Sequence, residues 1–205
     1  NRHSKSLATA ILASLVACAA ACGGDDGIDS DEEARRAYLG LDLSIEKALN
    51  LGIDGFNAAS SANIPLQASI GDEAGTIEVS GQVDQGASSN KEMRLYVSLV
   101  DYTDGPFFVD EAAEEEIEII YNTDPAELPY LQLSLRDIPD GTFSGTLTGA
   151  YEMLGDIEGT ATLELSMSGD IEESGAGGIQ RVVGTTQVTG VARSGDGTYE
   201  VNIIL

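Results

Sequence analysis

The chain has 205 residues, of which 35 are acidic and 10 basic, and its formal net charge is −25. A surface this negative repels nucleic acid and anionic lipid head groups, so we expect neither as a direct ligand. Glycine is abundant at 24 residues, tryptophan is absent and aromatic residues make up 5% of the chain, a composition that suits a β-rich domain with many turns.

The first 22 residues have the order of a secretory signal. Arg2 and Lys5 form a basic start, residues 7–16 are uncharged and mostly apolar, and small residues follow as far as Cys22. The apolar run covers about ten to fifteen residues, whereas a membrane-spanning helix needs roughly twenty. We therefore expect residues 1–22 to be an export signal and not a transmembrane anchor.

The end of this segment contains the chain's cysteines. Leu15-Val16-Ala17-Cys18 resembles the lipobox of bacterial lipoproteins, in which an aliphatic residue and two small or aliphatic residues precede the cysteine that becomes acylated. Ala19-Ala20-Ala21-Cys22 lacks the aliphatic first residue, but it follows a longer apolar run and precedes a Gly-Asp stretch. We favour Cys18 as the lipidated residue and keep Cys22 as the alternative. A disulfide between them would close only a short loop beside the signal, so we do not expect one.

The resemblance to a lipobox implies that the chain is exported and held at a membrane by acyl groups, without a protein span. The residue after the lipidated cysteine would be Ala19 or Gly23, and neither is the aspartate that retains lipoproteins at the inner membrane. The predicted location is therefore the bacterial outer membrane, with the domain facing the periplasm or the outside.

A tether and a helix are expected next. Residues 23–30 predict a flexible acidic tether, and residues 31–205 predict a single helix-plus-β domain. Ser30-Asp31-Glu32-Glu33 is a capping box, which marks the start of a helix. The residues that follow predict one amphipathic helix over residues 31–50, with Asn50-Leu51-Gly52 as its end. Its apolar positions recur at intervals of three or four: Ala34, Tyr38, Leu41, Ile45, Ala48 and Leu49. We expect its apolar side to pack on the domain's own sheet.

From residue 64 onward the apolar period changes from 3.6 to 2. The clearest case is 157–169, where apolar residues and glycines alternate with Thr, Ser and Glu. The same alternation occurs in 77–83, 93–99, 131–136, 143–151, 182–194 and 199–205. Short glycine-rich breaks separate these segments, which predicts a mainly β fold: an antiparallel meander barrel or sandwich of about 8–10 strands with one N-terminal amphipathic helix.

Several catalytic chemistries are excluded by residue types. The histidine of the chain is His3, inside the predicted signal, so histidine triads and histidine-ligated metals are not expected in the domain. The densest oxygen sources, residues 101–105 and 110–116, do not have the spacing of an EF-hand loop, and we interpret them as solvated loops. We expect no catalytic residue, no metal site, no cofactor and no enzymatic activity.

The mature domain resembles uncharacterised bacterial lipoproteins through residues 38–42 (YLGLD) and 55–64 (GFNAASSANI), together with the lipobox before them and the Gly/Thr-rich strands after them. This resemblance implies no activity. We therefore expect a lipid-anchored, non-enzymatic structural or interaction module of the cell envelope, whose partner is another envelope protein.

Two alternatives remain open. The first is a lipocalin-like carrier of a small apolar ligand, for which the small residues Gly145, Gly149, Gly159 and Ala161 would leave room inside a barrel. The second is a small outer-membrane β-barrel, because strands with apolar residues outside and polar residues inside produce the same alternation. The lipobox and the low aromatic content argue against the second alternative.

Overall fold

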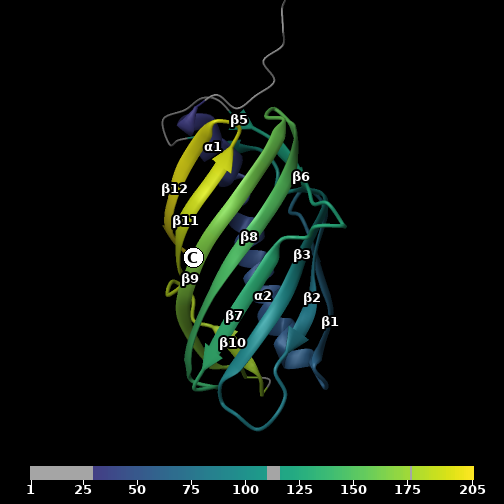
Figure 1. Ribbon diagram of the computed structural model, residues 1–205, viewed down its shortest axis with the longest axis vertical. Helices are drawn as coiled ribbons and strands as arrows, with labels where there is room; N and C mark the ends of the chain where they lie inside the picture. Colours follow the sequence, from purple (N-terminus) through teal and green to yellow (C-terminus); the bar gives the residue numbers. More distant parts are fainter. Residues whose placement is uncertain (1–29, 110–115, 176) are drawn as a thin grey trace, which may run out of the picture.

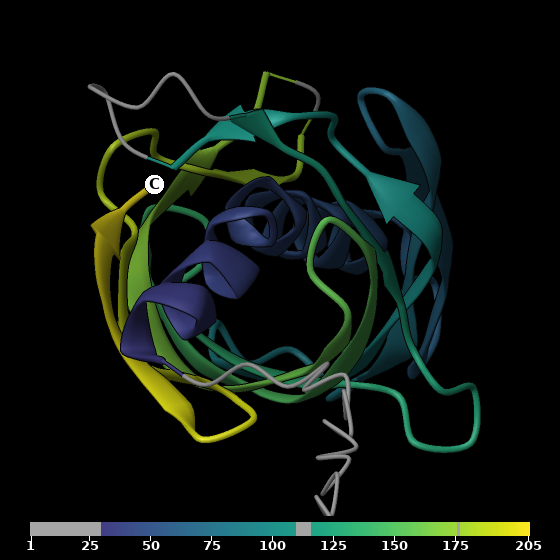
Figure 2. The same cartoon turned by 90° about the horizontal axis from the view of Figure 1, so that it is seen from above.

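The computed structural model describes residues 30–109, 116–175 and 177–205. A tall, curved antiparallel sheet forms most of the molecule (Figure 1). Seen from above, its strands form a ring around the helices (Figure 2). This mainly β, barrel-like arrangement confirms the predicted fold class.

The sheet follows a nearly sequential antiparallel path. Its strands are β1 (Asn63–Ile70), β2 (Ala74–Val83), β3 (Lys91–Thr103), β6 (Ile119–Asn122), β7 (Tyr130–Arg136), β8 (Gly141–Gly155), β9 (Gly159–Glu173), β10 (Ile179–Arg181), β11 (Gln187–Ser194) and β12 (Gly197–Ile204). The order is β1-β2-β3-β6-β8-β9-β11-β12, with β7 pairing with β3 and β8, and β10 pairing with β9. A separate short pair joins β4 (Phe107–Phe108) to β5 (Glu116–Ile117).

The predicted strand over 182–194 is shorter in the structure, because residues 182–186 form a turn. β10 ends at Arg181, and the chain turns through Gly184, whose φ of +76° favours glycine, before β11 begins at Gln187. The side chain of Arg181 is only 5% exposed, and its Nε and Nη2 donate hydrogen bonds to Thr186 Oγ1 at 3.1 and 3.0 Å. This buried guanidinium holds the corner between the two strands.

The single predicted helix is instead two: α1 (Asp31–Leu39) and α2 (Asp42–Ala58). The capping box is present at the start of α1, where Ser30 Oγ accepts a hydrogen bond from the Glu33 backbone N–H at 3.3 Å. At the break, the Tyr121 hydroxyl donates to the Ala37 carbonyl at 2.8 Å and lies 2.3 Å from where a Cβ on Gly40 would be. The approach of Tyr121 therefore requires glycine at position 40 and occupies a carbonyl that a continuous helix would use.

The second helix also continues past its predicted end near Gly52. Gly52 lies inside α2, where a Cβ would meet Leu95 Cδ1 at 2.9 Å. The glycine therefore allows close packing of α2 on β3 and does not end the helix. Near the end of α2, the Asn57 side-chain amide makes two hydrogen bonds to the backbone of Ile179 on β10. Its Nδ2 donates to the Ile179 carbonyl at 2.8 Å, and its Oδ1 accepts from the Ile179 N–H at 2.9 Å.

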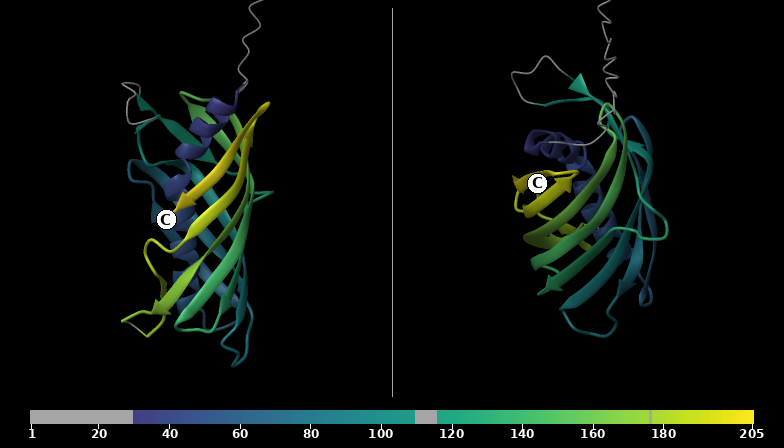
Figure 3. Two further views of the ribbon diagram at one scale, coloured as in Figure 1. Left: turned by 90° about the vertical axis from the view of Figure 1, so that its left-hand side faces the viewer. Right: turned by 45° about the horizontal axis from the view of Figure 1, so that its top comes forward.

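The helices occupy the inside of the curved sheet. β1 and β12 are the two ends of the sheet path and do not pair with each other. α2 packs against β1, β2 and β10, and α1 packs against β9, β11 and β12, so the helices also cover the gap between the ends (Figure 3). The barrel is thus completed by helices and not by a final strand pair.

One hydrophobic core joins the helices to the inner side of the strands. Strand side chains with exposures of 2% or less include Leu95, Val97, Leu133, Leu163 and Leu165, and the helix side chains that face them include Tyr38, Leu41, Ile45 and Leu49. The intervening strand residues, such as Thr146 and Ser166, point outward and are exposed. Burial of apolar surface at about 25 cal/mol per Å² is therefore the main force that holds the strands around the helices.

Candidate functional site

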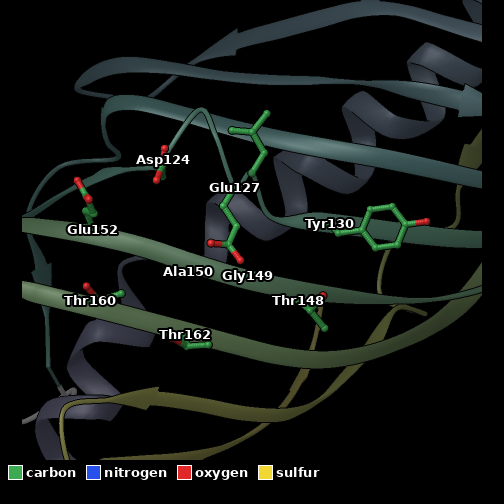
Figure 4. A pocket seen from close by; sticks show the side chains of 10 residues that line it. Asp124, Glu127, Tyr130, Thr148, Gly149, Ala150, Glu152, Thr160 and Thr162 are labelled. Carbon is green, nitrogen blue, oxygen red and sulfur yellow. The ribbon is translucent and has the colours of Figure 1, made fainter.

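The outer side of the sheet carries an acidic hollow of about 520 Å³. Its floor is made by β8 and β9, and the segment between β6 and β7 overhangs it (Figure 4). The lining consists of Asp124, Glu127, Leu128, Tyr130, Thr148, Gly149, Ala150, Glu152, Thr160 and Thr162. All ionisable groups of this lining apart from the Tyr130 phenol are carboxylates, so the hollow attracts cationic groups.

The overhanging segment is held by its own hydrogen bonds. Asp124 Oδ1 accepts from the Ala126 N–H at 2.8 Å, and the Asp124 carbonyl accepts from the Glu127 N–H at 3.0 Å. Pro129 packs against Gly149, where a Cβ would lie 2.5 Å from Pro129 Cα. The segment can therefore lie close to β8, which brings Glu127 over the strand (Figure 4).

A second hollow of about 560 Å³ lies on the other side of Tyr130. Its lining consists of Asn63, Ile64, Ser80, Gly81, Gln82, Arg94, Tyr96 and Tyr130. Arg94 is bound to the Asp84 carboxylate at 3.0 Å.

The two hollows meet at the tyrosine pair, Tyr96 on β3 and Tyr130 on β7: Tyr130 lines both hollows, and Tyr96 lines the larger one. The two residues are direct cross-strand partners, with ring centroids 5.5 Å apart and planes inclined at 49°. Tyr96 is 48% exposed. Tyrosine combines a large apolar surface with a hydroxyl and loses little side-chain entropy on binding, so such a pair is suited to contact with a partner.

The comparisons with known proteins bring no further assignment. No family model matches this chain, and no curated protein or solved structure matches it either. The candidate site therefore depends on its own geometry. Among the described helices, none is both long and apolar enough to cross a membrane.

The predicted lipidation residues, Cys18 and Cys22, lie outside the described residues. Of the oxygen-rich segments, 110–115 also lies outside them, whereas Asp104 is bound within the protein. Lys47 Nζ is 2.5 Å from Asp104 Oδ1 and 2.7 Å from Asp72 Oδ1, and the Tyr102 hydroxyl donates to Asp104 Oδ2 at 2.6 Å. We call these four side chains the Lys47 clasp; it joins α2 to the β1–β2 turn and to the end of β3.

Within the described ranges, no group of three or more His, Cys, Asp or Glu side chains could hold a metal ion. The carboxylates of the acidic hollow are accordingly spread along the surface and do not converge on one point. This arrangement suits contact with an extended cationic ligand better than coordination of a single ion.

A different pair of polar groups is buried at the α1–α2 break. Tyr38 is fully buried, and in the described part of the chain neither its hydroxyl nor Asp42 Oδ1 has a hydrogen-bond partner. Burial raises the pKa of Asp42 to about 6, and the neighbouring Tyr38 hydroxyl lowers it by a smaller amount. Burial, and then the Asp42 charge, raise the pKa of Tyr38 far above its usual value.

The tyrosine pair was not predicted from the sequence. Alternation places Tyr96 on the outer side of its strand beside Arg94 and Ser98. Its partner Tyr130 is 34 positions later in the sequence and belongs to β7, which pairs with β3 although β6 lies between them in the chain. The glutamates were equally hard to select, because the chain contains 35 acidic residues. A signal that could have helped is the turn Asp124-Pro125, which marks an overhang beside a strand.

Proposed function

We propose that this chain is a lipid-anchored, non-enzymatic module of the bacterial cell envelope, which contacts another envelope protein through the outer side of its barrel. The acyl anchor would be attached at Cys18 or Cys22 and would hold the chain at the outer membrane. Residues 23–30 would then act as the tether between the lipid and the barrel.

The observation that carries this proposal is that helices fill the inside of the barrel. Tyr38, Leu41, Ile45 and Leu49 are 2% exposed or less, and they occupy the volume that a carrier would need for a ligand. An anchored domain with a filled interior offers its outer surface for recognition. This favours the interaction module over a lipocalin-like carrier.

The direction of the strand alternation also supports the proposal. Leu163 and Leu165 face the helices, whereas Thr162, Glu164 and Ser166 point away from them. A barrel embedded in lipid requires apolar residues on its outer side. The observed direction therefore favours a tethered domain surrounded by water over the outer-membrane barrel.

The anchor can be tested by labelling bacteria that express the chain with a clickable palmitate analogue. We expect the unchanged chain to be labelled and the Cys18→Ala, Cys22→Ala double variant to carry no label. The single variants identify the acylated residue, which we expect to be Cys18. A labelled double variant, or an unchanged chain without label, would contradict the proposal.

The location is tested by a matched pair of chains. One retains residues 1–22, and the other carries an ordinary cleavable export signal in front of residue 23. We expect the first in the outer-membrane fraction and the second in the soluble periplasmic fraction. If the second also fractionates with membranes, the barrel itself binds lipid and the anchored module is the wrong description.

A further inference from the structure

We propose that the tyrosine pair and the acidic hollow bind an extended polypeptide segment that contains lysine or arginine. The proposal rests on the function above for the compartment in which the partner is found. It goes further by naming the surface, the chemistry of the partner and the side chains that recognise it.

The shape of the surface favours a segment of chain that crosses the strands. Tyr130 lines both hollows, of about 560 and 520 Å³, and Tyr96 beside it lines the larger one, so a ligand that crosses the pair can reach both hollows. A compact ligand would fill only one of the hollows and would leave the other empty. An extended backbone covers both rings and alternates its side chains between the hollows and solvent.

Charge selects among extended partners. Glu127, Glu152 and Asp124 line one hollow without a basic residue among its lining, and the whole chain has a net charge of −25. Tyr130 lines the same hollow as these carboxylates, so this hollow offers a lysine or arginine of the partner both a ring face and an acidic group. An acidic segment would be repelled by the same groups, and a second copy of this chain brings equal negative charge.

The geometry separates this partner from a metal ion. In the described ranges, the three carboxylates do not form a group that could hold a metal. Glu127 comes from the overhang, whereas Glu152 comes from β8 (Figure 4). Carboxylates distributed in this way match charges repeated along a peptide.

The test uses the full acylated chain in nonionic detergent and a fluorescent ten-residue peptide of alternating lysine and threonine. Binding is followed by fluorescence anisotropy at low salt. A peptide with glutamine in place of each lysine is the ligand control. We expect the lysine peptide to bind and the glutamine peptide to bind at least about tenfold more weakly, because its uncharged side chains do not pair with the carboxylates.

Two pairs of variants locate the binding surface. Glu127→Gln with Glu152→Gln removes two charges from the acidic hollow, and Glu172→Gln with Glu200→Gln removes two exposed charges elsewhere. We expect the first pair to weaken binding about fivefold and the second pair less than twofold. Equal losses from both pairs would show attraction to the overall charge and would overturn the proposal.

The tyrosine contribution has its own matched control. Tyr96→Ala removes an exposed ring, and Val100→Ala shortens a side chain that is 52% exposed on the same side of β3. We expect about a fivefold loss from Tyr96→Ala and almost none from Val100→Ala. Circular dichroism verifies that each variant retains its β structure.

A neutral chitotetraose probe tests the competing carbohydrate reading. If this sugar binds, Tyr96→Ala abolishes its binding and the lysine peptide does not bind, the surface recognises glycans and the peptide proposal is wrong. Failure of both probes also overturns it. The palmitate labelling is independent: a labelled chain that ignores the peptide refutes only the docking surface, and an unlabelled chain that binds the peptide refutes only the anchor.

Discussion

Replacement of Asp42 by asparagine is expected to make the protein more stable at neutral pH. Asp42 is partly buried at the start of α2, and its buried Oδ1 has no hydrogen-bond partner in the described part of the chain. Asparagine has nearly the same shape but carries no charge, so Asp42→Asn removes the cost of burying an ionised group and leaves the packing unchanged.

The magnitude follows from the pKa. Burial raises the pKa of Asp42 from its usual 3.8 to about 6, and each unit corresponds to about 1.4 kcal/mol. The charged form therefore costs the folded state about 3 kcal/mol at neutral pH. Asparagine loses a favourable interaction of the charge with the helix N-terminus, at most about 1 kcal/mol. The expected gain in the free energy of unfolding is about 2 kcal/mol, or roughly 4–8 °C in Tm for a chain of this length.

The raised pKa of Asp42 also determines how the stability of the protein changes with pH. Well below pH 3.8, near about pH 3, the carboxyl is protonated in both the folded and the unfolded chain, so Asp42 costs nothing there. As the pH rises from about 4 to about 6, the unfolded chain ionises first and the folded protein loses stability. Above about pH 6 both forms are ionised and the cost stays constant. The two proteins should thus be equally stable near about pH 3 and diverge up to about pH 6.

Urea unfolding of the non-acylated chain from residue 23, followed by circular dichroism between about pH 3 and pH 8, measures this difference. Asp54→Asn is the control, because Asp54 is exposed on the same helix, and we expect it to change the free energy of unfolding by less than about 0.5 kcal/mol. Parallel pH profiles for Asp42→Asn and the unchanged chain would refute the reasoning, and so would a variant less stable at pH 7.

The remaining predictions concern the core and the Lys47 clasp. Leu95→Ala removes a fully buried side chain that packs on α2 at Gly52 and should lower the free energy of unfolding by about 2–5 kcal/mol in urea titrations; a loss below 1 kcal/mol would mean that the inner packing is loose. Lys47→Met keeps the length of the side chain but leaves Asp104 without its cation, and we expect a loss of about 2 kcal/mol, measured in the same way and larger at low salt than at high salt. An unchanged stability would show that the clasp contributes nothing.

The strands could be predicted because their pattern is local. In 157–169, the polarity of each residue predicts the side of the sheet on which it lies. As alternation requires, β9 places Leu163 and Leu165 inside and Glu164 and Ser166 outside. The antiparallel class followed from these segments and the turns between them. Nothing in this pattern says what lies against the inner side, so barrel and sandwich stayed open.

The helices show where local reasoning fails. The apolar positions Tyr38, Leu41, Ile45 and Leu49 indicated a helix with one buried side, but the break at Gly40 depends on Tyr121, a residue of β6 that hydrogen-bonds to a carbonyl 84 positions earlier. The sequence predicts a helix end at Gly52, whereas in the structure this glycine lies inside α2 and allows contact with Leu95. In both cases a long-range contact determines what the glycine does, and a single sequence does not contain that information.

The helix-filled barrel and the acidic surface together constrain how the exposed tyrosines act. Tyr96 and Tyr130 would be a site for self-association on a neutral protein, but two copies at −25 each repel one another at low ionic strength. Salt shortens the range of this repulsion from about 10 Å at 0.1 M to about 3 Å at 1 M. Contact between copies therefore strengthens with salt, whereas contact with a basic segment weakens, and the direction of the salt dependence identifies which partner the tyrosine pair serves.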